Sequence, residues 1–376
     1  MNKKRIIVLG AGLVGKTIAI DLAQDHEVTS VDINEEVLHE IAVDHKIDTI
    51  KADLSDHVNT KKIIQDYDLV IGAVPGFMGF NTLKAVIEAG KNIVDISFFP
   101  EDPFELDKLA TDNEVVAIVD CGVAPGMSNM IMGYHNEQME VETFKCFVGG
   151  LPLNPEWPWK YKAVFSPIDV LEEYIRPARY IENGEQVVKP ALTDPEIIDF
   201  GPAGKLEAFN TDGLRTLAKT MKAPNMIEKT LRYPETIEYL KVLRDTGYFD
   251  KEKIKINDTE IRPIDFTAKL LFPKWKMKEG EEDFTVMRVI ISGKEDGENK
   301  EYVYDLYDKY SKSTQTISMA RTTGYTCTAV ANLILNDQYL DQGISPPEYI
   351  GAKKLCFDNV VKYLEQRNVC YKITKN

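Results

Sequence analysis

The stretch that decides the fold is Arg5-Ile6-Ile7-Val8-Leu9-Gly10-Ala11-Gly12-Leu13-Val14-Gly15. Its first half, Arg5–Leu9, is a short β-rich run, and its second half has the spacing G-x-G-x-x-G. Residues 16–23 then have the length and composition of a helix, with Ile18 and Leu22 on one face. Because three glycines at this spacing are common by chance, the strand–turn–helix order carries more weight than the glycines themselves.

This order is typical of a dinucleotide-binding turn. Gly10 permits the tight turn, Gly12 lets a pyrophosphate approach the backbone, and Gly15 lets the helix pack against the strand. The free N–H groups at the start of the helix would face the phosphates. We therefore expect all six residues of the turn to contact the cofactor: Gly10, Ala11, Gly12, Leu13, Val14 and Gly15.

An acidic residue stands where the nucleotide ribose would lie. The β-rich run His26–Val31 ends in Asp32, which lies 22 residues after Gly10. Such an acid binds the adenosine ribose hydroxyls. A 2′-phosphate would meet Asp32 as a like charge, and Ile33-Asn34 supplies no cation, so we predict NAD and not NADP. The alternative is a plain glycine turn followed by a solvated aspartate.

Composition limits the possible partners. The chain has 376 residues, 44% apolar and 28% charged, with a net charge of −15. This length favours two domains, and the negative charge argues against nucleic acid or an anionic membrane as a partner. No run of 18 apolar residues occurs, and the Lys3–Arg5 cluster precedes too short an apolar run for a signal peptide. We expect a cytoplasmic protein.

Cysteine and histidine usage gives no sign of a metal site. The five cysteines are scattered without a C-x-x-C, and the five histidines show no ligand spacing. Scattered cysteines are typical of reduced intracellular thiols. We therefore predict no metal.

Alternating strands and helices continue to about residue 122. Apolar runs at 47–50, 67–74, 92–96 and 115–119 alternate with helical patterns, giving six strands in all. This pattern predicts an α/β Rossmann domain, a doubly wound parallel sheet, over residues 1–122. Ligands of such sheets bind beyond the carboxyl ends of the strands. That rule adds Asp53 and Ala73-Val74-Pro75 to the cofactor site, although Asp53 is equally well explained as a helix cap.

From Val141 the apolar residues alternate, which is typical of antiparallel strands with one covered face. Phe284–Ser292 and Glu301–Tyr310 flank Asp296-Gly297, a strong hairpin signal. We predict an α+β second domain with an antiparallel sheet over residues 123–315. Residues 316–376, which begin with a helix over 316–335, are expected to pack back on the first domain.

Charged groups near the crevice would distinguish an enzyme from an NAD-binding regulator. Asp95 and Asp120 both stand at strand ends and are the candidate catalytic groups, with a loop-capping carboxylate as the alternative for each. A substrate carboxylate would need a guanidinium. The candidates are Arg176, Arg179, Arg215 and Arg321. Thr211 and Asp212 precede Arg215, where they would cap a helix or face a ligand.

Several blocks resemble the saccharopine dehydrogenase family, most closely its lysine 6-dehydrogenase-like branch. They run in the family's order from Gly10 to about Pro347. Besides the glycine turn, the blocks are Asp120–Asn129, Gly149–Pro152, Tyr161–Ala178, Glu207–Leu214 and Met319–Tyr325. The resemblance implies an NAD(P)-dependent oxidoreductase that acts on the C–N bond of a lysine-derived amine, and a homodimer formed through the second domain. It also implies a substrate site at Ser97, Gly122, Val123, Asn129, Thr211, Asp212 and Arg215.

Two positions depart from the saccharopine-reducing pattern. As aligned, those enzymes carry Asp where this chain has Ala124 and Arg where it has Ile168. Both charged groups would bind the glutamate half of saccharopine. Their loss favours NAD-dependent oxidation of free L-lysine at its ε-carbon, giving the 6-semialdehyde that cyclises to a piperideine carboxylate. A saccharopine or carboxynorspermidine-type dehydrogenase is the alternative within the family, and an NAD-binding regulator is the alternative outside enzymes.

Overall fold

The computed structural model describes residues 3–278 and 280–376. The chain forms two compact units, each built from separate segments. Unit 1 contains residues 1–138 and 320–370, and unit 2 contains residues 139–319 and 371–376. The units therefore divide the chain at 138/139 and 319/320, later than the expected boundaries after 122 and 315. The last six residues belong to unit 2.

Unit 1 is built on a parallel sheet of seven strands in the order β17-β6-β5-β4-β1-β2-β3. The order reverses between β1 and β4, which is where ligands bind in doubly wound folds. The strands are β1 (Arg5–Leu9), β2 (Glu27–Asp32), β3 (Asp48–Lys51), β4 (Leu69–Gly72), β5 (Ile93–Asp95), β6 (Val116–Ile118) and β17 (Gly343–Ser345). The Rossmann prediction is confirmed, and the sequence pattern missed only the seventh strand, β17.

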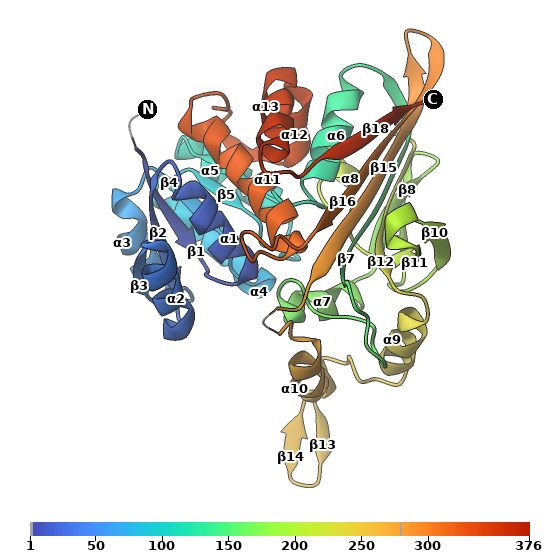
Figure 1. Ribbon diagram of the computed structural model, residues 1–376, viewed down its shortest axis with the longest axis horizontal. Helices are drawn as coiled ribbons and strands as arrows, with labels where there is room; N and C mark the ends of the chain where they lie inside the picture. Colours follow the sequence, from blue (N-terminus) through green and yellow to red (C-terminus); the bar gives the residue numbers. More distant parts are fainter. Residues whose placement is uncertain (1–2, 279) are drawn as a thin grey trace. The chain divides into compact units, whose positions relative to one another are not determined.

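The helices of this unit pack on the sheet or on one another (Figure 1). They are α1 (Leu13–Leu22), α2 (Glu35–His45), α3 (His57–Ile63), α4 (Gly76–Glu88), α5 (Asp107–Asp112), α6 (Met127–Asn136), α11 (Ser318–Leu335), α12 (Pro347–Ala352) and α13 (Lys354–Glu365). Helix α1 begins inside the glycine turn, earlier than the expected residue 16, because Gly12 is its N-cap. Apart from the edge strand β3, the strands are largely buried on both faces, as the continuous apolar runs predicted.

Unit 2 is built on a nine-stranded sheet whose main order is β10-β11-β12-β7-β15-β16-β18; β8 also pairs with β12, and β9 pairs with β8. The strands are β7 (Glu140–Pro152), β8 (Ala178–Glu182), β9 (Glu185–Lys189), β10 (Glu196–Asp199), β11 (Lys205–Asn210), β12 (Asn225–Arg232), β15 (Asp283–Glu295), β16 (Glu298–Lys309) and β18 (Tyr371–Lys375). The sheet is mixed, because β12 pairs with β7 in parallel. The other pairings in this sheet are antiparallel, so the predicted α+β domain with an antiparallel sheet is confirmed apart from this one pair.

The hairpin expected at Asp296-Gly297 is confirmed. Glu295 pairs with Glu298, and both turn residues have positive φ, at 53° and 82°. Two positive φ values are the signature of a type I′ turn. The strands on either side are longer than predicted because cross-strand pairing continues up to the turn.

One face of the unit 2 sheet carries the apolar core of that unit, which includes Trp275, Phe209 and Phe284. The helices of this unit are α7 (Pro167–Glu173), α8 (Leu217–Thr220), α9 (Thr236–Asp245) and α10 (Pro263–Trp275). A small hairpin, β13 (Ile254–Ile256) with β14 (Thr259–Ile261), extends beyond α10 (Figure 1).

Candidate functional site

The three glycines of the turn have different roles. Gly10 has φ +107°, and a Cβ there would lie 2.3 Å from the Ala73 carbonyl oxygen. A Cβ on Gly15 would lie 2.1 Å from the Gly10 carbonyl oxygen. Around Gly12, in contrast, a Cβ would meet no described atom within 4 Å. Gly10 and Gly15 are therefore required by packing, while Gly12 leaves open space at the N-terminus of α1, where a pyrophosphate would bind.

Asp32 is held beside this turn. Its Oδ2 accepts a hydrogen bond from the Ala11 N–H at 2.7 Å, and its Oδ1 accepts one from the Asn34 N–H at 2.9 Å. The residue is partly exposed at the carboxyl end of β2. A carboxylate has about four lone-pair sites, so these two bonds leave acceptor capacity for ribose hydroxyls.

Apolar side chains surround the same edge of the sheet. Leu13, Ile33 and Phe77 follow β1, β2 and β4 and are 47%, 63% and 69% exposed. Each follows the carboxyl end of a strand, where the nucleotide lies in this fold. They leave apolar surface exposed beside the open space at Gly12, where the planar rings of a dinucleotide would find apolar contacts.

The remaining predicted cofactor residues lie at neighbouring strand ends. The Ala73 N–H donates to the Leu9 carbonyl at 2.9 Å, and Pro75 is the N-cap of α4, with Val74 between them. Asp53 is exposed and accepts from the backbone N–H and the hydroxyl of Ser55, at 2.9 and 2.6 Å. These two bonds lower the pKa of Asp53. The N-cap of α3 is Asp56, so Asp53 is a turn residue and not a helix cap.

Asp95 and Asp120 lie at the carboxyl ends of adjacent strands, β5 and β6. Both are buried, at 0% and 2% exposure. Asp95 accepts from the Ser97 N–H at 2.8 Å and from the Ser97 hydroxyl at 3.2 Å, so the predicted substrate residue Ser97 orients a candidate catalytic group. Burial raises the pKa of the Cys121 thiol, and the nearby Asp95 and Asp120 carboxylates add to this effect.

The loop Gly122–Asn129 is closed on itself. The Gly122 N–H donates to the Pro125 carbonyl at 3.0 Å, and the Ser128 N–H donates to the Val123 carbonyl at 3.2 Å. The buried Asn129 accepts from the Gly126 N–H at 3.2 Å through its Oδ1. Asn129 therefore shapes this loop from inside unit 1.

Glu348 is a buried residue that the sequence analysis missed. The Asn129 amide donates to the Glu348 carboxylate at 3.1 Å. This contact is possible because α6 and α12 approach closely, and a Cβ on either Gly133 or Gly351 would lie 2.0 Å from backbone of the other helix. The only sequence signal was an acid in the first turn of a helix that begins with Pro347.

The predicted substrate residues Thr211, Asp212 and Arg215 lie together in unit 2, after β11. The Thr211 hydroxyl is 2.8 Å from the Thr230 hydroxyl, and Arg215 is buried with a left-handed φ of 52°. Asp212 accepts two hydrogen bonds from the Arg179 guanidinium, at 2.8 and 2.7 Å. This bidentate pair engages both Asp212 and the candidate anchor Arg179.

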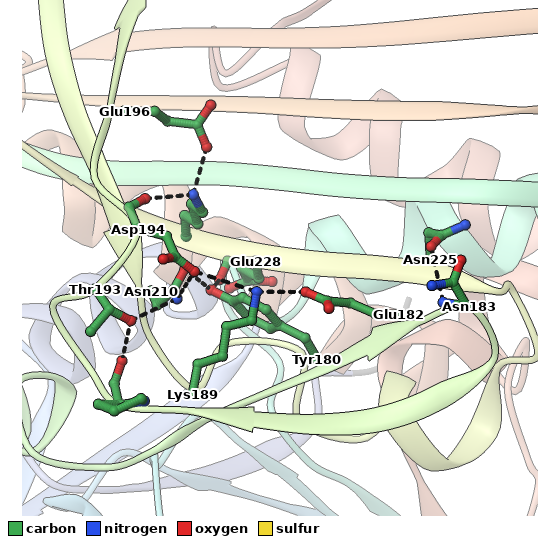
Figure 2. Close-up of polar contacts among 12 residues, drawn as sticks. Tyr180, Glu182, Asn183, Lys189, Thr193, Asp194, Glu196, Asn210, Asn225 and Glu228 are labelled. Carbon is green, nitrogen blue, oxygen red and sulfur yellow. Dashed lines mark hydrogen bonds and ion pairs between the residues drawn. The ribbon is translucent and has the colours of Figure 1, made fainter.

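Asn210, just before this group, is held by several partners (Figure 2). Its amide donates to the Thr193 hydroxyl and the Asp194 carboxylate, at 2.9 and 3.0 Å. Its carbonyl accepts from the Tyr180 hydroxyl at 2.8 Å. These bonds fix the start of the Thr211–Arg215 segment, which favours a rigid arrangement of its side chains.

The other candidate anchors have partners too. Arg176 contacts the Glu172 carboxylate at 3.3 Å. In unit 1, Arg321 donates to the Arg367 carbonyl at 3.0 Å and lies over the Tyr325 ring at 5.5 Å. The sequence analysis also overlooked Arg232, a buried cation that lies 4.4 Å from the Tyr161 ring centre and donates to the Tyr174 hydroxyl at 3.0 Å. Arg232 ends β12, a strand with several polar residues, so no sequence signal pointed to its burial.

Two further observations concern the described residues 3–278 and 280–376. Within them, no group of three or more His, Cys, Asp or Glu side chains is placed to hold a metal ion. Among the helices in this same part of the chain, none combines the length and apolarity needed to span a bilayer.

Family models match both parts of the chain. The model for the saccharopine dehydrogenase NADP binding domain matches residues 6–118, and that for the saccharopine dehydrogenase C-terminal domain matches residues 122–369. Among solved structures, the apo saccharopine dehydrogenase (L-Glu forming) from Saccharomyces cerevisiae has a TM-score of 0.79 and 19% identity, covering 99% of this chain and 100% of that chain. The homospermidine synthase of Legionella pneumophila in complex with NAD has a TM-score of 0.69 and 11% identity, covering 100% and 92%. At these identities the two structures show the fold.

Sequence relatives differ in how much of their length they share with this chain. The mitochondrial alpha-aminoadipic semialdehyde synthase of Mus musculus is 25% identical over 280 residues, which cover 70% of this chain and 30% of that protein. The saccharopine dehydrogenase [NADP(+), L-glutamate-forming] of Pyricularia oryzae is 26% identical over 271 residues, covering 67% and 60%. The carboxyaminopropylagmatine dehydrogenase of Synechocystis is 22% identical over 324 residues, covering 79% and 80%. The chain thus spans less than a third of the mouse protein's length.

Proposed function

This chain belongs to the saccharopine dehydrogenase family, and we propose that it is an NAD(P)-dependent dehydrogenase that acts on a carbon–nitrogen bond of an amine. Within that class, we propose NAD-dependent oxidation of L-lysine at its ε-carbon. The lysine-derived substrate and the lysine 6-dehydrogenase-like branch rest on the sequence blocks, and the use of NAD rests on Asp32. The structure contributes the placement of the residues involved.

The observation that carries the choice of lysine is the environment of Ile168. Ile168 lies in the first turn of α7 and packs against the apolar core of unit 2. A charged side chain with a role in binding the glutamate half of saccharopine is therefore replaced by one that contributes to packing. In unit 1, Ala124 gives the Gly122–Asn129 loop a small apolar side chain where the saccharopine-reducing pattern has a carboxylate. Both changes favour a smaller substrate that carries fewer charges.

The reaction places specific demands on the protein. Bound NAD would accept the hydride that leaves the ε-carbon. The lysine ε-amine has a solution pKa near ~10.4, so it arrives protonated and must lose a proton before it can give up hydride. Oxidation gives an iminium; water then adds to it, ammonia leaves, and the resulting semialdehyde closes on the α-amine.

We assign the proton-handling role to Asp95 and Asp120. Their burial at adjacent strand ends places two carboxylates in one region of unit 1, where they would hold the ammonium and accept its proton. Ser97 fixes the orientation of the Asp95 carboxylate. We assign the substrate α-carboxylate to Arg215, because a guanidinium offers paired donors and Arg215 is buried beside Thr211 and Asp212.

A substrate panel tests the proposal. Purified protein with NAD and L-lysine should produce NADH, followed at the nicotinamide absorbance, with little turnover of saccharopine. Arg215→Ala should raise the KM for lysine roughly 10- to 150-fold, the cost of a lost charge-assisted contact of ~1.5–3 kcal/mol. Cadaverine, which has no carboxylate, should be affected far less. Arg176→Ala is the matched control, since Arg176 is paired with Glu172. Robust turnover of saccharopine with none of lysine would refute the assignment.

A second candidate is supported by a specific comparison. The carboxyaminopropylagmatine dehydrogenase match extends over a larger share of both chains than do the matches to the mouse and Pyricularia proteins. A carboxyalkylated polyamine is therefore the alternative substrate class, and it belongs in the same panel. Preference for such a secondary amine over lysine would select this candidate.

We also propose a homodimer. Strand β18 is an edge of the unit 2 sheet, and its Ile373 is 55% exposed. An exposed edge strand presents unpaired backbone groups to a partner. Sedimentation equilibrium should give twice the mass of 42.6 kDa, and a mass of a single chain at micromolar concentration would refute the dimer.

A further inference from the structure

A lysine lies next to the predicted ribose-binding acid. In the pairing of β2 with β3, the register partner of Asp32 is Lys51. Paired strands lie ~4.8 Å apart, and a lysine side chain is longer than that distance. The Lys51 ammonium is therefore within reach of the adenosine ribose that Asp32 would bind, and of a 2′-phosphate on it.

This lysine is engaged by an acid from the adjacent helix. The Lys51 Nζ lies 2.6 Å from a carboxylate oxygen of Glu35, the first residue of α2. The pair is exposed, with 54% and 71% of the two side chains accessible. The bond to Lys51 lowers the pKa of Glu35, so the acid stays ionised at neutral pH. An exposed ion pair is weak, and a phosphate would compete for the cation if Glu35 were neutral.

Lys16, the lysine that follows the glycine turn, is also paired with an acid. Lys16 directly follows Gly15 in α1, and its ammonium lies 2.5 Å from Glu40 of α2. Helix α2 thus supplies an acid to each of these two lysines. It also places Glu36 in its first turn, and among residues 3–278 and 280–376 this acid has no such lysine partner.

We propose that Glu35 withholds Lys51 from a 2′-phosphate, so that the Glu35–Lys51 pair is a second determinant of NAD over NADP, independent of Asp32. This inference rests on the proposed use of a nicotinamide cofactor. Asp32 excludes the phosphate by direct repulsion, whereas Glu35 acts by pairing with Lys51, a cation that would otherwise bind the phosphate. Removing Glu35 alone should therefore convert Lys51 into a phosphate ligand.

The test measures nucleotide binding without substrate. The Kd values for NADPH and NADH are determined by calorimetry for Asp32→Ser alone and for Asp32→Ser combined with Glu35→Gln. The added Glu35→Gln should lower the Kd of NADPH about fivefold, the effect of one exposed charge pair, and leave that of NADH nearly unchanged. If Asp32→Ser does not fold, the same comparison is made with Glu35→Gln in the wild-type chain.

Two further variants distinguish an effect of the Glu35–Lys51 pair from an effect of the overall charge near the nucleotide. Glu36→Gln removes the same charge one residue away and should change the Kd of NADPH less than twofold. Adding Lys51→Met to Glu35→Gln should abolish the gain. Equal gains from Glu35→Gln and Glu36→Gln, or a gain that survives Lys51→Met, would overturn the inference. Binding of NADH without turnover of any amine would refute the proposed function and leave this inference standing, whereas binding of neither nucleotide would overturn both.

Discussion

The Gly12→Ala substitution adds a single methyl group, which should weaken cofactor binding without lowering the stability of the protein. Gly12 has φ −64°, a backbone conformation open to any residue, and an added Cβ meets no described atom within 4 Å. Gly→Ala at such a position stabilises a protein by about 0.4–1 kcal/mol, because the unfolded chain loses conformational freedom. The Cβ would, however, stand where the pyrophosphate approaches the backbone.

We expect the melting temperature of Gly12→Ala to be unchanged or slightly raised, while NADH binding weakens roughly 10- to 150-fold. The second figure is the loss of one charge-assisted hydrogen bond from the turn, ~1.5–3 kcal/mol. Calorimetric unfolding and titration with NADH measure the two quantities on the same preparation. Unchanged NADH affinity, or a large drop in melting temperature, would refute the assignment of this turn to the cofactor.

Gly15→Ala is the matched control in the same turn. Its Cβ would lie 2.1 Å from the Gly10 carbonyl oxygen and 3.3 Å from the Ala73 Cβ. The backbone must shift to relieve this overlap, at a cost of about 1–3 kcal/mol. Gly15→Ala should therefore lower the melting temperature, which Gly12→Ala should not.

Three further predictions concern buried acids. Burial raises the pKa of Asp283 from 3.8 to about 6; the folded state therefore binds this proton more tightly than the unfolded chain. As pH rises from 4 to 6, the free energy of unfolding of the wild type should fall by about 2–3 kcal/mol relative to that of Asp283→Asn, as measured by urea unfolding. The same pH dependence in both proteins would contradict this. Asp21 is 2.7 Å from the Arg367 guanidinium, so Asp21→Asn should cost about 3–5 kcal/mol in the same assay, against under ~1 kcal/mol for the exposed control Asp112→Asn. Asp95→Asn and Asp120→Asn should each lower kcat ~10²-fold or more, and full turnover by both folded variants would make them structural.

The fold of unit 1 was predictable because its information is local. The glycine turn, the acid at residue 32 and the apolar runs each reflect the conformation of a few consecutive residues. Element ends were less accurate: α1 begins at Leu13, before the expected residue 16, because Gly12 is its N-cap. Strand β17 was missed because its three residues become a strand only by pairing with β6.

In unit 2, too, the sequence predicted local structure better than the pairing of strands. The alternating pattern predicted its strands and the Asp296-Gly297 hairpin, but the partner of each strand is chosen by contacts distant in sequence. The parallel pair of β12 with β7 and the edge position of β18 are examples. Alternation specifies which face of a strand is buried and says nothing about its neighbours.

In the candidate site, too, some features follow from the local sequence and others depend on tertiary contacts. The sequence by itself predicted which residues stand at strand ends, and it predicted Asp32 as the ribose-binding acid. Only the tertiary structure decided that Ser97 orients Asp95, that Arg179 pairs with Asp212, that Glu348 reaches Asn129 and that Lys51 is bound by Glu35. Each of these pairs except the first joins separate elements of the fold, so its energy exists only when those elements pack together.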